Sequence, residues 1–488
     1  MPAPFEIRDH ALFRQAALIG GQWVDVHDYP TAVPVLNPAD QSVVGSTPIL
    51  NAIDVERCID AAKGAFPAWS RTTAKDRAAI LKRFAELMHE NIGDLATIMT
   101  LEQGKPLAEA RGEIVYAAGF VEWFAEECKR LSGETIPSPW VDKRLMVLRQ
   151  PIGVVAAITP WNFPSAMVTR KAIPAIAAGC TVILKPAEQT PFSALALGVL
   201  AERAGLPAGV LNIVTGDAPM IGKILCDHPD VRKLTFTGST EVGRILMAQC
   251  APTVKKLGLE LGGNAPFIVL DDADLDAAVV GAMASKYRNA GQTCVCANRF
   301  LVQSGVYDAF IEKLATASEK LVVSHGFDPQ AQQGPLIDHD AISKIEALVS
   351  DAVAQGAKVV VGGRRSVSGS LFYKPTVLTN VTASMRIAQE EVFGPVAPVI
   401  RFESDEECIR LANSTEYGLA AYFYGQNMNR VWRMMEALEF GIVGVNSGVV
   451  STEVAPFGGV KQSGIGREGG SEGLREFTEL KYVCIGGI

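Results

Sequence analysis

The sequence predicts an α/β fold with two open, doubly wound parallel-sheet domains and a small β element outside both. Three observations support this prediction. The chain has 488 residues, which is too long for one hydrophobic core. Between about residues 150 and 262, short apolar runs alternate with helix-like segments, as in a parallel sheet covered on both faces. A second alternation of the same kind begins at Pro266.

The first alternation contains four strands and four helices. Apolar, β-branched runs predict strands at 154–158, 181–185, 210–214 and 234–236. The segments that follow them predict helices at 164–178, 191–204, 220–226 and 240–250. We expect four earlier helices to pack onto this sheet, at 54–66, 74–91, 92–104 and 107–130.

The second alternation runs through strands at 266–270, 299–303 and 358–361. Two apolar-patterned segments, 144–149 and 481–488, have no partner in either alternation, and exposed edges of this kind favour pairing with another chain. We therefore divide the chain into three parts. They are a first domain (1–129 and 149–259), a second domain (260–467) and a small β element (130–148 and 468–488).

Composition limits the partners and the compartment. With 48% apolar residues and a net charge of −8, we expect no nucleic-acid or membrane partner. The N-terminus has no apolar segment, so we expect no signal peptide, and the longest apolar run, 172–184, is too short to span a bilayer. Nine cysteines without a compact framework predict a cytoplasmic protein. Scattered histidines predict no metal site.

The segment Gly291-Gln-Thr-Cys294-Val-Cys296 is the most informative one in the chain. A polar lead-in after a glycine break predicts a thiol on a turn, where it can meet a substrate. A small buried hydrophobe is the alternative role of such a cysteine. A nucleophilic Cys294 would need a base and an oxyanion donor elsewhere in the chain.

Polar residues follow the strands of the first sheet, at the edge where doubly wound sheets bind ligands. Asn162, after the first strand, is either a ligand-facing amide or a helix N-cap. Glu188, after the second strand, can accept hydrogen bonds from the ribose of NAD and would repel the extra phosphate of NADP. Gly238-Ser239, after the fourth, either faces a pyrophosphate at a helix N-terminus or is ordinary capping.

The general-base candidate is Glu260, at the end of a Gly-flanked apolar strand. Burial should raise its pKa, which suits a base that activates water near pH 7. A buried structural ion pair is the alternative. The run Gly464-Ile-Gly466-Arg-Glu-Gly469 matches the dinucleotide-binding pattern by letter, but it lacks a preceding strand and is interpreted as a loop.

Together these motifs resemble those of the aldehyde dehydrogenase superfamily, from about residue 20 to the C-terminus. Thr159-Pro-Trp-Asn162-Phe-Pro is similar to its oxyanion motif, Leu259-Glu260-Leu-Gly-Gly to its base motif, and Gly291-Gln-Thr-Cys294 to its nucleophile motif. Glu390-Glu391-Val-Phe393-Gly-Pro395 is similar to the segment that holds the nicotinamide ribose. The resemblance implies two Rossmann-type domains, the first of which binds NAD(P), and a bridging β element that joins subunits into dimers or tetramers.

The resemblance also implies roles for single residues. Cys294 would form a thiohemiacetal and then a thioester, Asn162 would hold the oxyanion, and Glu260 would activate water. Lys185 is expected to contribute to both catalysis and cofactor binding. The expected cofactor is NAD, with NADP as a second one. Its expected contacts are Thr159, Pro160, Trp161, Lys185, Glu188, Gly216, Gly238, Ser239, Glu391 and Phe393.

Within the family, three runs resemble the succinate-semialdehyde dehydrogenase branch: Gly291 to Arg299, Arg467 to Gly470, and Lys481 to Ile485. There, two arginines and a serine hold the distal carboxylate of the substrate, and they match Arg170, Arg288 and Ser451. Surface salt bridges are the alternative role of the arginines. The implied reaction is the oxidation of succinate semialdehyde to succinate. Glutarate semialdehyde and sulfolactaldehyde are alternative substrates, because one methylene or a sulfonate changes little at such a site.

Two further expectations concern the cysteines. Cys296 is close enough in sequence to Cys294 that oxidation could join them as a disulfide and switch the enzyme off. A cysteine hydrolase, in which a histidine is the base, is the alternative from a different class of protein, although no histidine lies in these motifs.

Overall fold

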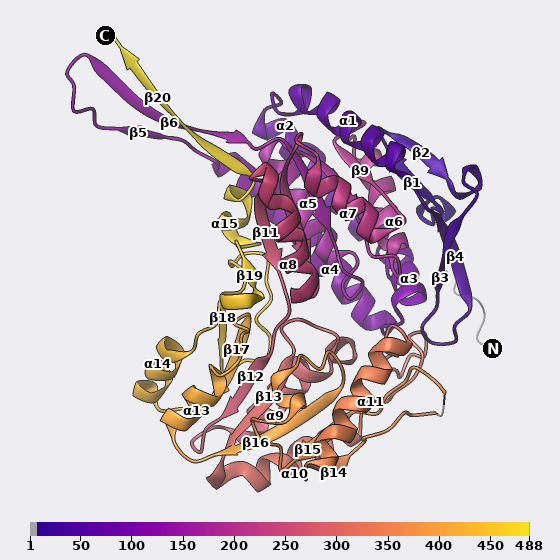
Figure 1. Ribbon diagram of the computed structural model, residues 1–488, viewed down its shortest axis with the longest axis vertical. Coiled ribbons are helices and arrows are strands. Elements are labelled where there is room, and N and C mark those ends of the chain that lie inside the picture. The colour runs from indigo at the N-terminus through magenta and orange to yellow at the C-terminus, as the bar shows by residue number, and fades with distance from the viewer. Residues whose placement is uncertain (1–6, 368, 488) are drawn as a thin grey trace.

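The computed structural model describes residues 7–367 and 369–487. Two lobes and a protruding arm make up the chain (Figure 1). Each lobe is built on a mostly parallel sheet, and the arm is an antiparallel sheet of three strands. The predicted fold class is thereby confirmed. Part of the N-terminal stretch on which the signal-peptide prediction rests, residues 1–6, lies outside the described residues.

The first lobe contains an eight-stranded sheet in the order β19-β11-β10-β7-β8-β9-β1-β2. The strands from β11 to β9 run parallel, β19 and β1 are antiparallel to them, and β2 is antiparallel to β1. Its strands are β1 (Ala16–Ile19), β2 (Gln22–Asp25), β7 (Val154–Ile158), β8 (Thr181–Lys185), β9 (Leu211–Ile213), β10 (Val231–Thr237), β11 (Lys256–Glu260) and β19 (Gly464–Ile465). The predicted strands at 154–158 and 181–185 have the observed bounds.

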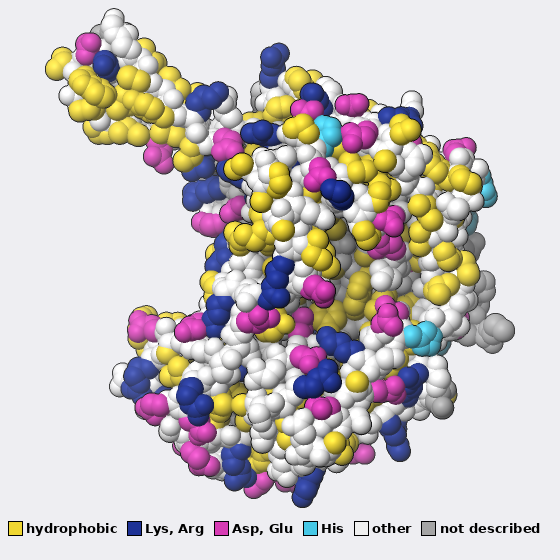
Figure 2. All heavy atoms as spheres, viewed as in Figure 1, with side chains coloured by type: hydrophobic (Ala, Val, Ile, Leu, Met, Phe, Trp, Pro, Cys, Tyr) yellow, Lys and Arg dark blue, Asp and Glu magenta, His cyan; other side chains and the backbone are white. Residues whose placement is uncertain are grey.

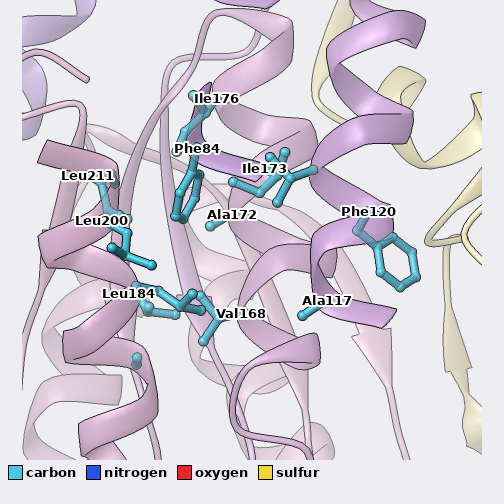
Figure 3. Packing of buried hydrophobic residues seen from close by; sticks show 14 of the residues in the cluster. Phe84, Ala117, Phe120, Val168, Ala172, Ile173, Ile176, Leu184, Leu200 and Leu211 are labelled. Atoms are coloured by element: carbon cyan, nitrogen blue, oxygen red, sulfur yellow. The ribbon is translucent and has the colours of Figure 1, made fainter. Parts of the chain in front are cut away.

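Helices cover both faces of this sheet, because alternate residues of its strands enter two different cores. Val155 and Ala157 of β7 pack with the first group of helices below, and Val154 and Ala156 with the second. Figure 3 shows the first core, where Ile173 and Ile176 lie beside Phe84. The first group is α2 (Ala74–Glu90), α3 (Ile92–Gln103), α4 (Leu107–Glu127), α5 (Ala166–Ala178) and α6 (Pro191–Arg203); the second is α1 (Ala52–Trp69), α7 (Ala218–Asp227) and α8 (Thr240–Cys250).

The second lobe has a seven-stranded sheet in the order β14-β15-β16-β13-β12-β17-β18, in which only β14 is antiparallel to its neighbour. Its strands are β12 (Ala265–Val269), β13 (Ala297–Gln303), β14 (Lys358–Val361), β15 (Thr376–Thr379), β16 (Val396–Phe402), β17 (Ala420–Tyr424) and β18 (Ile442–Val445). Its helices are α9 (Leu275–Tyr287), α10 (Tyr307–Glu319), α11 (His339–Ala354), α12 (Arg386–Gln389), α13 (Asp405–Ala412) and α14 (Met428–Ala437).

The arm joins the two segments that were predicted to lack partners. β6 (Lys143–Pro151) pairs with β20 (Thr478–Gly486) along its whole length, and β5 (Glu134–Ile136) pairs with the other edge of β6. The surface of the arm is rich in hydrophobic side chains (Figure 2), among them exposed Leu148, Leu480 and Tyr482. A separate hairpin of β3 (Ala32–Leu36) and β4 (Val43–Pro48) lies near the N-terminus.

Three structural details bear on the predicted division, which stays a prediction. β6 continues to Pro151, past the predicted end of the arm at residue 148. The run Gly464–Gly469 is not wholly a loop, because its first two residues form β19 and pair with β11 of the first sheet. Helix α15 (Gly470–Arg475) packs on α4 and α5. The residues of this helix therefore lie with the first lobe and not in the arm. None of the helices in the described ranges is long and apolar enough to cross a membrane.

Candidate active site

The carboxyl ends of β7, β10 and β11 meet at one edge of the first sheet and face the second lobe. Parallel strands all end on the same side, which is why residues distant in sequence converge there. A cavity of about 270 Å³ lies at this junction. Its lining comes from both lobes: Pro160, Trp161, Asn162, Thr237, Gly238, Ser239, Leu261 and Gly262 from the first, and Cys294, Ala341, Lys344, Glu391, Val392 and Phe393 from the second.

Cys294 is half-buried and follows a strained turn. Asn289, Ala290 and Gly291 all have left-handed backbone, with φ of 51°, 56° and 75°. The main-chain N–H of Cys294 has no acceptor among the residues that the structure describes. Burial raises the pKa of the thiol to about 12, and the nearby charges of Arg170 and Arg288 oppose that increase. The site therefore supplies a thiol, a free donor and two cations.

Asn162 lies beside the cysteine loop and does not cap a helix. Helix α5 begins after Ser165, and the Asn162 side-chain N–H donates to the carbonyl of Gln292 at 3.0 Å. The N-cap interpretation is therefore wrong. The amide nitrogen carries two hydrogens, and no second acceptor lies near it within the described ranges, so one donor is left for a ligand.

Glu260 is buried at the end of β11, but it does not line the Cys294 cavity. Its carboxylate faces a small second cavity beside Glu468, and its Oε2 has no hydrogen-bond partner among the described residues. Burial first, and then the charge of Glu468, raise its pKa well above the usual range. The ion pairs in this region belong to Glu468, which contacts Lys171 and, at 2.9 Å, Arg170. A structural ion pair is therefore not the role of Glu260 here.

Several of the expected cofactor residues fit a dinucleotide. The rings of Trp161 and Phe393 meet edge-on, with centroids 5.5 Å apart. Glu391 accepts a hydrogen bond from the main-chain N–H of Gly263 at 3.0 Å, and burial raises its pKa to about 7. The buried hydroxyl oxygens of Thr159 and Thr237 have no partner in the part of the chain described. Thr237 lines the Cys294 cavity, where an unsatisfied buried hydroxyl indicates a polar ligand, whereas Thr159 does not line it.

Ser239 has both roles that the sequence left open. It caps α8 by accepting a hydrogen bond from the main-chain N–H of Val242 at 3.3 Å, and with Gly238 it lines the cavity.

Lys185, Glu188 and Gly216 do not line the Cys294 cavity. Lys185 ends β8, where burial lowers its pKa, and it forms an ion pair with Glu188 at 2.5 Å. Gly216 follows β9 with a φ of 117°, and a side chain there would come within 3.0 Å of the main-chain nitrogen of Leu50. The structure therefore gives Gly216 a packing role, and its contact with a cofactor stays a prediction.

The two predicted substrate arginines differ in their surroundings. Arg170 is buried, pairs with Glu468 and stacks on the ring of Phe457 at 4.0 Å. Arg288 has no carboxylate within ion-pair distance in residues 7–367 and 369–487, and its guanidinium lies 5.4 Å from the ring of Phe163. Ser451 is partly buried in the loop after β18. Neither arginine is in a surface salt bridge.

Sequence reasoning missed several residues near the site. Lys171 and Glu468 form a buried ion pair next to Glu260. The hydroxyl of Tyr116, on α4, is buried without a partner among described residues, near Phe120 and both arginines. Glu468 could have been noticed as the acid in the Gly464–Gly469 run. A tyrosine in a long helix gave no comparable signal.

Cys296 is buried behind the cysteine loop, with its thiol directed at the carbonyl of Lys286 at 3.5 Å. Both cysteines are free thiols in the structure, and the disulfide switch stays a prediction. No histidine lines the Cys294 cavity within the described residues, so the geometry gives a hydrolase no base. Those residues also contain no cluster of ligands arranged for a metal ion.

Two doubly wound lobes, with a cysteine and unsatisfied donors in the cavity between them, define a cysteine-dependent NAD(P) dehydrogenase. The chain belongs to the aldehyde dehydrogenase family, whose model, "Aldehyde dehydrogenase family", matches residues 23–483.

Similar proteins carry three different substrate names. The chain is 59% identical to the succinate-semialdehyde dehydrogenase (NADP+) GabD of Escherichia coli, which covers 99% of this chain and 100% of that protein. It is 58% identical to a glutarate-semialdehyde dehydrogenase of Pseudomonas aeruginosa, with the same coverage. It is 56% identical to a 3-sulfolactaldehyde dehydrogenase of Pseudomonas putida, over 99% of both chains. The crystal structure of an NADP-dependent enzyme from E. coli has a TM-score of 0.97 at 59% identity, over 99% of this chain and 100% of that one.

Proposed function

We propose that this enzyme oxidises an anionic semialdehyde, with succinate semialdehyde as its substrate and glutarate semialdehyde and sulfolactaldehyde as the alternatives. The observation that carries the proposal is the single cavity that contains Cys294, the Asn162 amide and the residues suited to a nicotinamide nucleotide. Arg288, which has no carboxylate within ion-pair distance among the described residues, supplies a cation for the distal anionic group.

The first half of the reaction takes place on Cys294. Its thiolate attacks the aldehyde carbon, and the carbonyl oxygen becomes an oxyanion that accepts hydrogen bonds from the Cys294 N–H and the Asn162 amide. Each such donor contributes about 3–4 kcal/mol to the stability of the transition state. Trp161, Glu391 and Phe393 would hold a nicotinamide nucleotide, which would supply the acceptor for the hydride that leaves as the carbonyl re-forms. A thioester then stays on Cys294.

The second half of the reaction uses Glu260. Its carboxylate takes a proton from water as the water oxygen attacks the thioester, and Cys294 departs as a thiolate. This step requires the side chain to turn from Glu468 toward Cys294. Repulsion between the two carboxylates, which contributes to the raised pKa of Glu260, favours that movement.

The test is a panel of kcat/KM values for succinate semialdehyde, glutarate semialdehyde, sulfolactaldehyde and uncharged butanal, each with NAD and with NADP. We expect the three anionic aldehydes to exceed butanal by about 10-fold or more, which is the effect of one charged contact. We expect succinate semialdehyde to rank first. A higher kcat/KM for butanal than for the anionic aldehydes would contradict the proposal. A higher kcat/KM for sulfolactaldehyde than for succinate semialdehyde would make sulfolactaldehyde the proposed substrate.

For the cofactor, we propose NAD with NADP also accepted. Glu188 would repel the 2′-phosphate of NADP if it stood alone, but its ion pair with Lys185 offsets part of that charge. The NADP+ in the name of the E. coli relative supports use of both. The same panel tests this proposal. A ratio of more than about 10³ between the kcat/KM values with the two cofactors, which corresponds to about 4 kcal/mol, would contradict it.

Replacing Glu260 with glutamine should separate the two halves of the reaction. We expect Glu260→Gln to release about one equivalent of NADH per active site in a rapid burst and then to turn over about 10²–10⁴-fold more slowly, because water is no longer activated. Stopped-flow absorbance measures both phases. In the unaltered enzyme, turnover should fall as the pH drops through the raised pKa of Glu260, since the base must be deprotonated.

Glu102→Gln is the matched control for Glu260→Gln, because Glu102 is equally buried but holds the start of α6 through the main-chain N–H groups of Phe192 and Ser193. It should lower stability and leave the burst and turnover per active site unchanged. If Glu260→Gln turns over at the normal rate, Glu260 is not the base.

We further propose a homodimer or homotetramer in the cytoplasm. The arm carries exposed Trp140, Leu148, Leu480 and Tyr482, and a second copy would cover them. The nine free cysteines support a reducing compartment. A stable, active monomer in sedimentation velocity would contradict the assembly.

A further inference from the structure

Asn289 is bonded at every polar atom, although its backbone is left-handed. Its main-chain N–H donates to Glu109 at 3.0 Å, and its carbonyl accepts from the main-chain N–H of Gln292 at 3.0 Å. Its side-chain oxygen accepts from Gln103 at 3.0 Å, and its side-chain nitrogen donates to the carbonyl of Asn162 at 2.9 Å. A left-handed residue that is not glycine persists only where its surroundings fix it, and here they do.

The direction of these hydrogen bonds is fixed from both ends. The main-chain N–H of Lys105 can only donate, and it donates to the side-chain oxygen of Gln103 at 3.0 Å. The other end of the Gln103 amide therefore donates to Asn289, whose own nitrogen must then point at Asn162. The carbonyl of Asn162 can only accept. The relay of Lys105, Gln103, Asn289 and Asn162 has one possible orientation, with no choice of amide rotamer.

This relay crosses between the lobes. Gln103 and Asn162 belong to the first lobe, whereas Asn289 lies in the cysteine turn of the second. A second bond runs the opposite way, from the Asn162 side chain to the carbonyl of Gln292. The Asn162 turn and the Cys294 turn are thus tied to each other by both the main chain and the side chain of Asn162.

Buried charges hold the first-lobe side of this connection. The Lys105 ammonium donates to the carbonyl of Asn162 at 2.8 Å and pairs with Glu113 at 2.5 Å. Glu113 in turn accepts from the main-chain N–H of Ser165 at 2.9 Å and of Ala166 at 3.2 Å, at the start of α5. The Asn162 turn is therefore held firmly on its own lobe, and the bonds to Asn289 and Gln292 relate it to the nucleophile.

We propose that Asn289 is a positioning residue that sets the distance between the two oxyanion donors, the Asn162 amide and the Cys294 N–H. This inference rests on the proposed oxyanion role of Asn162. Its physical basis is that the two donors lie on different lobes, so neither lobe alone can fix their separation. Displacement of a reacting group by about 1 Å can cost 10²-fold in rate.

Asn289→Gly is the decisive variant. Glycine adopts the left-handed backbone without strain but has no side chain, so it separates a conformational role of Asn289 from its hydrogen bonds. We expect kcat/KM with succinate semialdehyde to fall about 10²-fold per active site, since the oxyanion donors lose their relative position. Alkylation of Cys294 by iodoacetamide, which forms no oxyanion, should keep its rate within about twofold. Active sites are counted by that alkylation.

Asn212→Ala is the matched control. Asn212 is a fully buried asparagine in β9 that also makes hydrogen bonds to main-chain groups, those of Gly20, Val182 and Gly209. It should lose thermal stability to a similar extent and keep kcat/KM per active site. Asn289→Gly activity within twofold of the unaltered protein would overturn the proposal. So would a parallel fall in alkylation and turnover, because it would mean that Asn289 only holds the cysteine turn in place.

Gln103→Glu tests the same relay without changing either catalytic turn. A carboxylate oxygen would replace the donor that faces Asn289, and the Asn289 amide would have to reverse or move away from Asn162. We expect Gln103→Glu to lower kcat/KM and to leave the alkylation of Cys294 unchanged. This variant tests the relay even if Asn289→Gly does not fold. Unchanged kcat/KM in a folded Gln103→Glu protein would contradict the relay. If the unaltered protein oxidises no aldehyde at all, the proposed function fails instead.

Discussion

Cys294→Ala should abolish the formation of NADH from every aldehyde, with a loss of about 10⁴-fold or more in kcat, while NAD still binds. The substitution removes the sulfur that carries the thiohemiacetal and the thioester, and no other cysteine among the cavity-lining residues can replace it. The cavity walls made by Trp161, Glu391 and Phe393 are unchanged, so the proposed cofactor contacts are kept. NADH absorbance measures the first outcome, and a fluorescence titration with NAD measures the second.

Cys296→Ala is the matched control for Cys294→Ala. Its thiol is buried and faces the carbonyl of Lys286, away from the proposed chemistry. We expect turnover of this variant within a few-fold of normal. If Cys294→Ala retained turnover, the reaction class proposed for the enzyme would be wrong. Loss of activity in both variants would show that the alanine at position 296 disturbs the shared turn, and then the NAD titration decides whether the cavity is intact.

The fold was predictable because hydrophobic periodicity is a local property of the chain. β7 and β8 were predicted to the residue, since a strand in a parallel sheet is apolar on both faces and ends where polar turn residues begin. The arm was predicted only as two segments without partners. The pairing of β6 with β20 joins residues more than 300 positions apart, and no local signal contains that information.

The sequence motifs pointed to Asn162 and Cys294, which the structure brings to one cavity, and to Glu260, which lines a different one; their catalytic roles stay predictions. The site was not predictable where the residue acts through packing. Glu468 lay inside a run that matched a dinucleotide motif by letter, and only the position of its carboxylate beside Lys171 and Arg170 distinguishes it. The sequence motifs did not single out Asn289. Its importance depends on three hydrogen bonds to residues distant in sequence, Gln103, Glu109 and Asn162.

The direction of the Glu260 carboxylate could not have been predicted at all. A strand ending in Glu260 can direct its side chain either to the cysteine or to Glu468, and both positions lie near the same strand end. The structure shows the second, in which Oε2 has no partner among the described residues. An unpaired buried carboxylate costs free energy. Protonation of Glu260, or rotation of its side chain toward a partner, would remove that cost.

Arg288→Ala should lower kcat/KM for succinate semialdehyde by roughly 10–100-fold and that for butanal by no more than a few-fold. A charge-assisted hydrogen bond contributes about 1.5–3 kcal/mol, which corresponds to that range. Arg288 is the better target of the two arginines because, unlike Arg170, it has no carboxylate within ion-pair distance among the described residues. Arg170→Ala would also remove one of the two cations paired with Glu468 beside Glu260, so its effect would mix substrate binding with base strength.

Arg401→Ala is the control for the loss of a positive charge on the second lobe. Arg401 lies over the ring of Tyr307 at 4.4 Å, on β16 and apart from the Cys294 cavity. Arg401→Ala should leave unchanged the ratio of kcat/KM for succinate semialdehyde to that for butanal. For Arg288→Ala the ratio itself is the measurement, because a general loss of folded protein lowers both values equally. If both fall together, Arg288 does not bind the distal anion. If Arg288→Ala lowers the ratio of kcat/KM for succinate semialdehyde to that for butanal, the guanidinium acts on the charge of the substrate. High salt, which screens charges, should also lower this ratio in the unaltered enzyme, as the anionic-semialdehyde proposal requires.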